Sequence, residues 1–549
     1  MSKSIDRNTI ANILESSDEG DDFSGISSDE YKPTDGEEST TESSDAEHID
    51  HQDEDVGDNL QEVNSAYSFH NTIWSVPNVA FVPRKTVSSP RVPDIGQRFK
   101  RTDNPYDVFM KIFPESLFMR ITQCTNERIE IFRKSKPVHK NTMLTDIGEI
   151  KIVLGCMIIM SYNRLPSIRH YWSKHCSMGN DAIKSAITRD RFQLLSSKMY
   201  FASPEKPEGA SKLYYIEDML ECLKSRFLSS RMESAYQSID ESMTKFKGRS
   251  SMKQYLPLKP TKRGIKMWLR CDALTGYTYD FNIYCGKEEG VLEGTLGERV
   301  VNKLAATIRK TDVTLCFDRF FTSINLLENL NYAALGTVMP NRKKLPVINI
   351  KLKKGQCILR ESNTGLMFAK WHDTKEVIVV SNCHSSEMST IEKKLQNGQK
   401  VNVDCPEMIK FYRQIMGGVD RADQIAGQYE LDRKSTKWWK KVFYRLLMMS
   451  VGNSWVISSQ LGRKQNPLIE FMIVLAENMI EEGKKKACVR RSGISGRKRK
   501  ISAGHLPIQI CNRRRCAGCA EQKKERRTKT ICEECQIPLC KDCFAPYHK

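Results

Sequence analysis

The stretch SIDESMTKF, residues 238–246, decides the fold, because it is the first run along the chain whose composition favours a β-strand. Ile, Thr and Phe are strand-forming residues, and Gly, Thr and Asp bound this run and those after it. Similar runs follow at 264–276, 277–286, 312–320 and 335–340, with helical spacing between them at 298–310 and 324–334. This order predicts an α/β fold with a mixed sheet.

Helical patterns lie on both sides of this block, because apolar residues recur there every three or four positions. They predict an all-helical domain over 96–235, and further helices over 406–430 and 431–483. The α/β core begins at 236–344. Residues 345–405 have irregular strand signals and Lys-rich loops, and we interpret them as an insertion into that core.

The first 95 residues differ in composition from the rest. They are rich in Ser, Asp and Glu, with too few large apolar side chains to offset the entropy of ordering, so we expect a disordered tail. Residues 1–60 hold 19 acidic and three basic residues, a net of −16. The whole chain carries +19, so residues 61–549 carry +35. A charge of that size favours a polyanionic partner, and nucleic acid is the first candidate.

We expect no membrane partner, although acidic lipid and ribosomal surfaces would also fit the charge alone. The start, MSKSIDRNTI, is polar with both signs of charge, so we expect no secretory signal. The longest apolar run, IVLGCMIIM at 152–160, is far below the ~20 residues that span a bilayer. We therefore expect a soluble protein, and 549 residues are enough to bury several cores.

Two aspartates stand near the ends of predicted strands, Asp240 in SIDES and Asp318 in CFDRFFTS. An unpaired carboxylate is costly to bury in an apolar setting, and shared cations would keep the pair charged. Mg²⁺ takes hard oxygen ligands, and two ions ~3.5–4 Å apart can stabilise both oxygens of an in-line phosphoryl displacement. Each Asp alone would more simply be a turn or cap residue.

A third carboxylate is offered by MGGVDRADQ, residues 416–424, where Asp420 and Asp423 lie three apart behind a Gly-Gly pair. An acidic residue in the first turn of a helix is favoured by the helix dipole and needs no metal. Two carboxylates on one helical face repel each other unless a positive group intervenes. From these residues alone, the metal-ligand interpretation and the helix-start interpretation are equally supported.

Three segments carry these residues and closely resemble the signature segments of the piggyBac family of DNA transposases: SIDESMTKFKGRSSMKQYLPLKPTKRGIKMW, CFDRFFTS, and FYRQIMGGVDRADQ with the Trp-Trp pair downstream. The likeness runs in the family's order from about residue 100 to the C-terminus, and it includes the acidic tail and the Cys-rich end. It implies an RNase H-like core. The implied catalytic aspartates are Asp240, Asp318 and Asp420, with Asp423 as a further acidic residue beside the third.

The resemblance also implies a reaction. Water nicks the transposon ends, the freed 3′-hydroxyl attacks the opposite strand to give a hairpin, and the reopened 3′-ends join a TTAA target. Every step is an in-line displacement at a phosphodiester, so one site with two Mg²⁺ (or Mn²⁺) ions on Asp240, Asp318 and Asp420 would serve them all. The implied partners are double-stranded DNA, as terminal repeats and target, and a second copy of the chain as a homodimer. The resemblance implies that residues 96–235 and 431–483 form the dimerisation and DNA-binding domain, and that residues 406–430 belong to the core and carry the third carboxylate.

Basic runs near these aspartates are candidate contacts to DNA phosphates, although an exposed basic face would look the same. The candidates are Lys245, Lys247, Arg249, Lys259, Lys262, Arg263, Arg433, Lys434 and Lys437. Trp438 and Trp439 alternate with cations, which suits stacking on an unpaired base, and we expect at least one of the two to be structural.

Residues 484–504 form a basic linker whose first part, 484–500, has nine basic residues and no acidic one. Split basic clusters suit a bipartite nuclear localisation signal or a phosphate-binding tether, and a solvated linker is the simpler alternative. We expect a nuclear protein that engages a nuclear import receptor.

Seven of the 18 cysteines crowd the tail at 505–549. Three pairs there have zinc-ligand spacing, and two histidines bring the candidates to eight, enough for two tetrahedral Zn²⁺ sites. The candidates are His505, Cys516, Cys519, Cys532, Cys535, Cys540, Cys543 and His548. The apolar content is low, so metal must supply the folding energy. The resemblance implies an interleaved cross-brace that recognises terminal repeats, with Cys511 outside it.

Four functions compete. An active transposase and a domesticated, catalytically silent DNA-binding descendant both fit the whole chain. A ubiquitin ligase would rest only on the tail and would leave most of the chain unexplained. A generic RNase H-type nuclease fits the acidic residues alone, and cleavage restricted to specific DNA ends would argue against it.

Overall fold

The computed structural model describes residues 72–175, 177–257, 259–287, 293–394, 400–431, 433–462, 466–487 and 505–548. We call residues 72–487 the body and residues 505–548 the finger, and each is described by itself. The acidic tail up to residue 71 and most of the basic linker, residues 488–504, lie outside the described residues. Within the described residues, no helix has the length and apolar content to cross a membrane.

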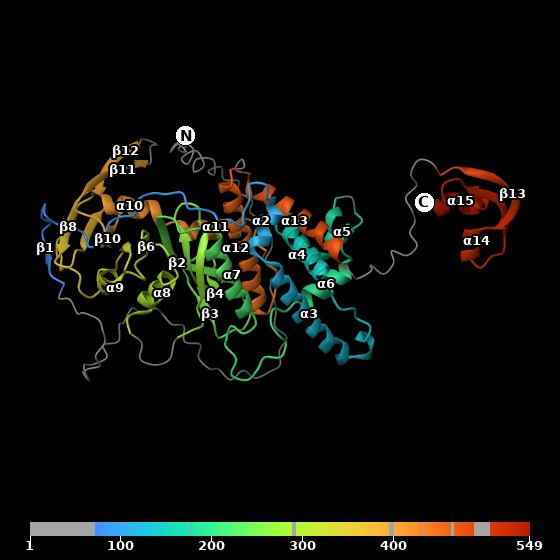
Figure 1. Cartoon of the computed structure of the whole chain (residues 1–549), viewed down its shortest axis with the longest axis horizontal. Coiled ribbons are helices and arrows are strands. Elements are labelled where there is room, and N and C mark those ends of the chain that lie inside the picture. Colours follow the sequence, from blue (N-terminus) through green and yellow to red (C-terminus); the bar gives the residue numbers. More distant parts are fainter. Residues whose placement is uncertain are drawn as a thin grey trace. The chain divides into compact units, whose positions relative to one another are not determined.

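A ten-stranded mixed sheet forms the centre of the body (Figure 1). Three neighbouring strands run parallel: β2 (Tyr236–Lys245), β6 (Thr314–Phe317) and β7 (Ala333–Thr337). Every other pairing in the sheet is antiparallel. The other strands are β1 (Trp74–Ser75), β3 (Lys253–Tyr255), β4 (Arg263–Asp272), β5 (Thr278–Ile283), β8 (Cys357–Ser362), β9 (Met367–His372) and β10 (Glu376–Ser381). The predicted mixed α/β fold is confirmed.

Helices cover both faces of this sheet because its central strands are apolar on both sides. Ile239, Leu315 and Phe317 pack with residues of α8 (Leu296–Ala305) and α9 (Ile324–Asn329). Alternate residues point the other way, and Cys316 packs there with Ile415 of α10 (Glu407–Ile415). Helix α11 (Gly418–Gln428) follows α10 on that same face and contacts β2.

The helices before and after the sheet share one apolar core. Helix α4 lies against α13 so closely that a Cβ on Gly483 would come within 2.6 Å of the Gly148 carbonyl oxygen. Glycine is needed at this crossing. The helices of this block are α2 (Pro105–Ile112), α3 (Glu115–Ser135), α4 (Ile147–Tyr162), α5 (Asp181–Ala186), α6 (Arg189–Lys198), α7 (Glu217–Ser230), α12 (Trp438–Gln460) and α13 (Leu468–Lys486).

Residues 72–95, which we assigned to the tail, are held in the body. We expected a tail up to residue 95, but β1 pairs with β8, and the Ser88 N–H donates to the Thr314 hydroxyl at 2.9 Å. Ile95 also forms a β-bridge with Arg231. Residues 72–95 are therefore held by backbone hydrogen bonds to the sheet and its surroundings, which a composition argument cannot detect.

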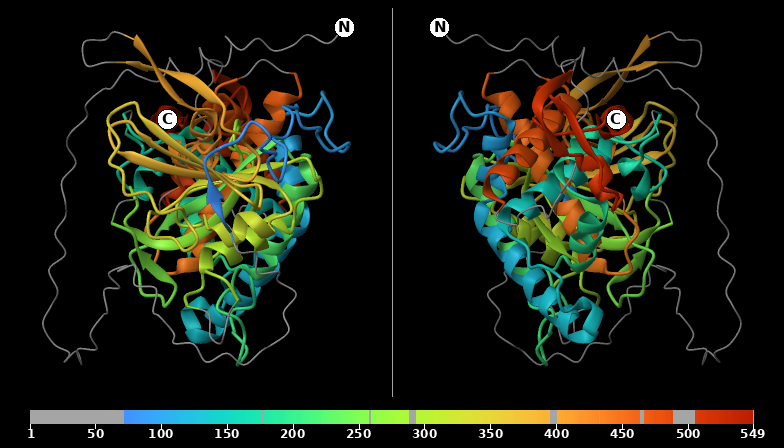
Figure 2. Two further views of the ribbon diagram at one scale, coloured as in Figure 1. Left: turned by 90° about the vertical axis from the view of Figure 1, so that its left-hand side faces the viewer. Right: turned by 90° about the vertical axis from the view of Figure 1, so that its right-hand side faces the viewer.

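The segment that we interpreted as an insertion, 345–405, contributes to the same sheet. Its first three strands, β8 to β10, extend the sheet because β10 pairs with β7. Its last two strands, β11 (Met388–Lys394) and β12 (Lys400–Pro406), form a separate hairpin that leads into α10. These yellow and orange strands lie toward the viewer on the left of Figure 2.

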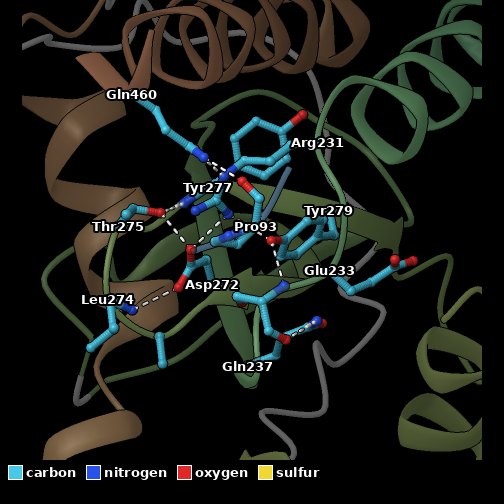
Figure 3. A network of polar contacts seen from close by, with 12 residues as sticks. Pro93, Arg231, Glu233, Gln237, Asp272, Leu274, Thr275, Tyr277, Tyr279 and Gln460 are labelled. Carbon is cyan, nitrogen blue, oxygen red and sulfur yellow. Dashed lines mark hydrogen bonds and ion pairs between the residues drawn. The ribbon is translucent and has the colours of Figure 1, made fainter. Parts of the chain in front are cut away.

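A buried ion pair joins the helical block to the sheet (Figure 3). The Arg231 guanidinium lies 2.7 Å from the Asp272 carboxylate, and each side chain is only 2% exposed. Arg231 also donates to the Tyr279 hydroxyl at 2.6 Å and to the Gln460 side-chain carbonyl at 2.9 Å. Several partners together make burial of this charge tolerable.

Asp272 of this ion pair also holds the turn at residues 272–275, and the start of α11 packs against that turn. Asp272 accepts from the Leu274 N–H at 2.9 Å and from the Thr275 hydroxyl at 2.8 Å. Gly418, at the start of α11, lies so close that a Cβ there would come within 2.8 Å of the Asp272 carbonyl oxygen. The Arg421 guanidinium donates to the Leu274 carbonyl. The position of α11 thus depends on the Asp272 turn.

We expect Asp272→Ala to lower the free energy of unfolding by about 3–5 kcal/mol, because it leaves Arg231 buried without its partner. Chemical denaturation followed by Trp fluorescence measures this. The control is Asp181→Ala, which removes an exposed pair with Lys184 at 3.2 Å and should change stability by about 0–1 kcal/mol. Equal losses in the two variants would contradict the role of the buried pair.

Candidate active site

Asp240 and Asp318 lie side by side at the end of the parallel pair β2–β6. In the register of that pair Ile239 of β2 stands opposite Phe317 of β6, and the residue after each of them is an aspartate. β6 ends at Phe317, and Asp318 begins the turn that leads to α9. The Asp318 carboxylate accepts the Phe320 N–H at 2.8 Å. The ends of parallel strands meet at one edge of the sheet, which is how residues 78 positions apart become neighbours.

Neighbouring cations and hydrogen bonds do not offset the effect of burial on the pKa values of these two carboxyl groups. Asp240 is 8% exposed, and burial, followed by the charge of Glu241, raises its pKa to about 8. Burial also raises the pKa of Asp318, and Glu241 adds to the shift. A cation bound between these groups would favour their ionised forms.

Helix α11 brings Asp420 to the same face. Ser238, Asp240 and Ser242 alternate along β2 and point to one side. The Val419 N–H donates to the Ser238 hydroxyl at 3.2 Å, which lays the start of α11 across this side of β2. Asp420 is exposed in the first turn of the helix. The structure thus brings the three predicted metal ligands to one region.

Asp423 has a different environment from Asp420. It accepts the Ser242 hydroxyl at 2.8 Å and forms an ion pair with Arg445 of α12. These contacts tie α11 to β2 and to α12. They also explain how two carboxylates three residues apart are tolerated on one helical face, because Arg445 pairs with Asp423 and offsets its charge.

Sequence reasoning missed Glu241 as a member of this site. Lys259, which we predicted as a DNA contact, instead pairs with the Glu241 carboxylate at 3.0 Å and donates to the Glu241 carbonyl at 3.4 Å. Burial lowers the pKa of Lys259, but the charges of Asp240, Glu241 and Asp420 outweigh it and raise that pKa. The signal available in the sequence was the adjacency of Asp and Glu in SIDES.

Divalent ions fit this donor set, because it offers hard carboxylate oxygens whose burial is not otherwise compensated. Among the described residues, however, no three of these carboxylates have oxygens that all lie within 4.8 Å of one another. One ion could not bind all three aspartates at this spacing. A pair of ions could be shared among them.

The predicted basic segments meet near the start of α12. The backbone at Gly248, in KFKGR, is close enough to Thr436 that a Cβ on Gly248 would lie 3.2 Å from the Thr436 carbonyl oxygen. Several predicted cations here are exposed: Lys245, Lys247, Arg249, Lys262, Arg263 and Lys434. Arg433 differs, because its guanidinium packs on Phe192 and against the sulfur of Met160. We therefore leave Arg433 out of the candidate DNA surface.

The two tryptophans also differ. Trp439 stacks on Tyr215, with ring centroids 4.3 Å apart and planes 23° apart. Trp438 meets Trp439 edge to face at 5.9 Å and stacks on no ring in the described residues. Trp439 is therefore structural, as we expected of at least one of the two, and Trp438 also packs partly against the core.

The finger brings together all eight predicted zinc ligands. Strand β13 (Pro507–Arg515) pairs with β14 (Arg527–Cys532), and α14 (Ala517–Glu521) and α15 (Lys541–His548) complete it. The ligands form two groups that interleave along the sequence, each with its atoms within 4.8 Å of one another. One group is Cys516, Cys519, Cys540 and Cys543, and the other is His505, Cys532, Cys535 and His548.

The histidines are oriented as metal ligands. His505 Nδ1 lies 3.2 Å from the sulfurs of both Cys532 and Cys535. His548 donates from Nδ1 to the Phe544 carbonyl at 2.8 Å, and its Nε2 is buried without a hydrogen-bond partner. A buried ring nitrogen left in this way fits zinc coordination. Cys511 is exposed and belongs to neither group.

Comparisons with known proteins show what the chain is similar to. The family model of transposase IS4 matches residues 104–455. PiggyBac transposable element-derived protein 3 of Homo sapiens is 28% identical over 444 residues, which cover 76% of this chain and 72% of that protein. PiggyBac transposable element-derived protein 2 of Homo sapiens is 26% identical over 463 residues, which cover 80% and 75%.

A solved structure is similar as well. It is the cryo-EM structure of the piggyBac transposase synaptic complex with hairpin DNA, with a TM-score of 0.64 and 21% sequence identity. The match covers 82% of this chain and 98% of that chain. At this identity, the similarity concerns the fold alone.

Zinc removal should unfold the finger and leave the body intact. We expect EDTA to collapse the NMR signals of residues 505–548, because a segment with so few apolar residues depends on metal for its fold. His548→Ala should have the same effect, whereas Cys511→Ser should not. A finger with unchanged spectra in EDTA would contradict a structural zinc role.

Proposed function

The chain belongs to the transposase IS4 family and is of the piggyBac type, and on that premise we propose that it is a metal-dependent DNA transposase. It would excise DNA ends through hairpin intermediates and join them to a TTAA target. The core that carries the acidic residues would be RNase H-like. The observation that carries the proposal is the meeting of Asp240, Asp318 and Asp420 at one edge of the sheet.

Each step of the reaction is an in-line displacement at phosphorus. Asp240 and Asp318 would hold divalent ions from adjacent strands, and Asp420 would do so from the first turn of α11. Bound there, two Mg²⁺ or Mn²⁺ ions would activate the attacking oxygen and balance charge on the leaving oxygen. Three carboxylates can therefore suffice without a His or Ser nucleophile.

Other residues at the site would hold the candidate metal ligands and Lys259 in place. Asp423 would hold α11 on β2 through Ser242 and Arg445. Glu241 would hold Lys259 beside the aspartates, where the ammonium balances their charge before metal binds. Lys259 would then lie next to the scissile phosphodiester.

The partner we propose is double-stranded DNA. The exposed cations of the loops beside β2 and α12 would contact phosphates, Trp438 would stack on an unpaired base, and the zinc-loaded finger would recognise terminal repeats. We also propose a homodimer, because two ends must be paired, and a nuclear location reached through an import receptor.

A second candidate is a domesticated protein that grips DNA without cutting it. The two human relatives are named as transposable element-derived proteins, which favours considering such a descendant. Both candidates need the fold, the finger and the basic surface. Only the first needs the carboxylates to bind metal, so a cleavage assay separates them.

The first test is cleavage of the DNA that flanks the gene, used as candidate transposon ends in Mg²⁺. Wild-type protein should yield nicks and hairpins, and Asp318→Asn or Asp420→Asn should reduce them by at least about a thousandfold with little change in DNA binding. Asp181→Asn, an exposed change on α5, is the control. Binding without products from wild type would favour the domesticated candidate. Continued cutting by either site variant would remove that residue from the metal site.

Lys259 should compete with metal for the acidic residues. We expect Lys259→Met to strengthen Mn²⁺ binding by about tenfold, because a nearby positive charge is worth up to a few kcal/mol at an effective dielectric near 20. Isothermal titration calorimetry on zinc-loaded protein measures this without any cleavage. Lys262→Met, an exposed change in the same loop, should leave binding unchanged. Weaker Mn²⁺ binding in Lys259→Met would contradict the competition.

A further inference from the structure

A recess with a volume of about 300 Å³ lies where three helices of the body meet. Its walls come from the first residue of α2, the last two turns of α12 and the first two turns of α13, which lie together near the middle of Figure 1. The described residues that line it include none of the active-site aspartates. The volume is at the lower end of the range for small-molecule sites, so the recess suits one side chain or a ligand of that size.

One wall of the recess is apolar and is held in position. The Trp455 indole N–H donates to the Asn466 carbonyl at 2.9 Å, which ties the ring to the loop before α13. Phe471 is buried, and Pro105 and Val474 complete the apolar lining. Aromatic and aliphatic surface of this kind can take the stem of a long side chain and the face of a planar cation.

The polar groups of the recess offer hydrogen-bond acceptors to a ligand. Ser458 is only 8% exposed, and its hydroxyl, which lines the recess, forms no hydrogen bond with any described residue. The Ser459 hydroxyl donates to the Trp455 carbonyl at 2.9 Å, so its lone pairs are left for a donor. Glu470 is exposed in the first turn of α13, and its carboxylate forms no ion pair with any described residue. A ligand with N–H donors and positive charge would satisfy all three groups.

The outer face of α13 beside the recess is acidic, although the chain as a whole is basic. Glu470, Val474 and Glu477 are all exposed, and their spacing of four and three residues places them on one face of the helix. Glu477 also forms no ion pair with any described residue. The two glutamates lie about 10 Å apart along the helix axis. Carboxylates without cations would repel DNA phosphates, so this face fits a basic protein segment.

We propose that the recess and the outer face of α13 bind a basic peptide segment of a partner protein. An arginine of the peptide enters the recess, where its planar guanidinium stacks on Trp455, pairs with Glu470 and donates to Ser458. A second basic residue three positions along an extended peptide lies about 10 Å away, at ~3.3 Å per residue, and meets Glu477. Lysine fits less well, because its compact ammonium lacks the planar, forked donors of a guanidinium. The proposal goes beyond the proposed function, because it needs neither DNA nor the active-site aspartates.

The test is ¹⁹F NMR of the full zinc-loaded chain labelled with 5-fluorotryptophan. The Trp455 resonance is identified by its absence from Trp455→Phe, so the readout reports this recess and not binding of a basic peptide to the acidic tail. The probe is a short glycine peptide with two arginines three positions apart, titrated to millimolar concentration. Its analogues carry lysine, or the neutral isostere citrulline, at the same two positions.

We expect the arginine peptide to shift the Trp455 resonance saturably, the lysine peptide to bind about threefold more weakly, and the citrulline peptide to have no effect. Glu470→Gln should weaken binding about tenfold, because it removes a charge-assisted hydrogen bond. Val474→Glu should strengthen binding about threefold by adding a carboxylate between Glu470 and Glu477, a gain that misfolding cannot produce. The matched control is Glu208→Gln, an exposed glutamate between α6 and α7, which should leave binding unchanged.

Each contrary result overturns a stated part of the proposal. An unmoved Trp455 resonance, or equal binding by wild type and Glu470→Gln, would overturn the site. Equal binding of the lysine peptide would overturn the choice of arginine, and free argininamide binding as tightly as the peptide would replace the peptide by a small amine. Self-association of the chain that Glu470→Gln removes would make the occupant a second copy. Glu470→Gln should cleave DNA as wild type does, so failure of this proposal and failure of the proposed function are distinguishable.

Discussion

The buried ion pair between Arg231 and Asp272 is the contact on which the arrangement of the body depends. It lies where α7 gives way to the first central strand, so it joins the helical block to the sheet. Burying both charges is tolerable because neighbouring hydroxyl, amide and backbone groups hydrogen-bond to them. The turn held by Asp272 supports the start of α11, and α11 carries Asp420. A contact with no chemistry of its own thereby positions a candidate metal ligand.

Two places in the body bring groups of like charge together with only partial compensation or none from opposite charges. Where the parallel pairing of β2 and β6 ends, the buried carboxyl group of Asp240 lies beside the half-buried carboxyl group of Asp318, with Lys259 as the cation that offsets them in part. At the start of α12 the cations of Lys437, Lys198 and Arg128 act on buried Lys440, and none of these four residues forms an ion pair with a carboxylate of the described residues. Each arrangement costs stability in the free protein and is relieved by a ligand of opposite charge. Together they suit a substrate that is a polyanion and a reaction that uses divalent cations.

Sequence patterns went wrong where the deciding contact was distant along the chain. Composition assigned residues 72–95 to the tail, although their backbone bonds to strands more than 200 residues away. We predicted Arg433 as a DNA contact from its charge alone, but its guanidinium packs on Phe192 and against the sulfur of Met160. The same limit applies to Lys259, whose partner Glu241 was visible only as the neighbour of Asp240. In each case the deciding partner belongs to another element of the fold.

The sequence by itself determined the mixed α/β fold, the helical blocks around it, the family, and the eight candidate metal ligands of the finger, because periodicity, motif order and Cys spacing are local signals. It also placed an aspartate near the ends of two strands and a third at the start of a helix. Only the tertiary structure decided that these three meet, through the β2–β6 register and the packing of Gly418 on Ser238. It alone separated Asp423 from Asp420 and Trp439 from Trp438, because burial and ion pairing arise from contacts between elements that no local pattern records.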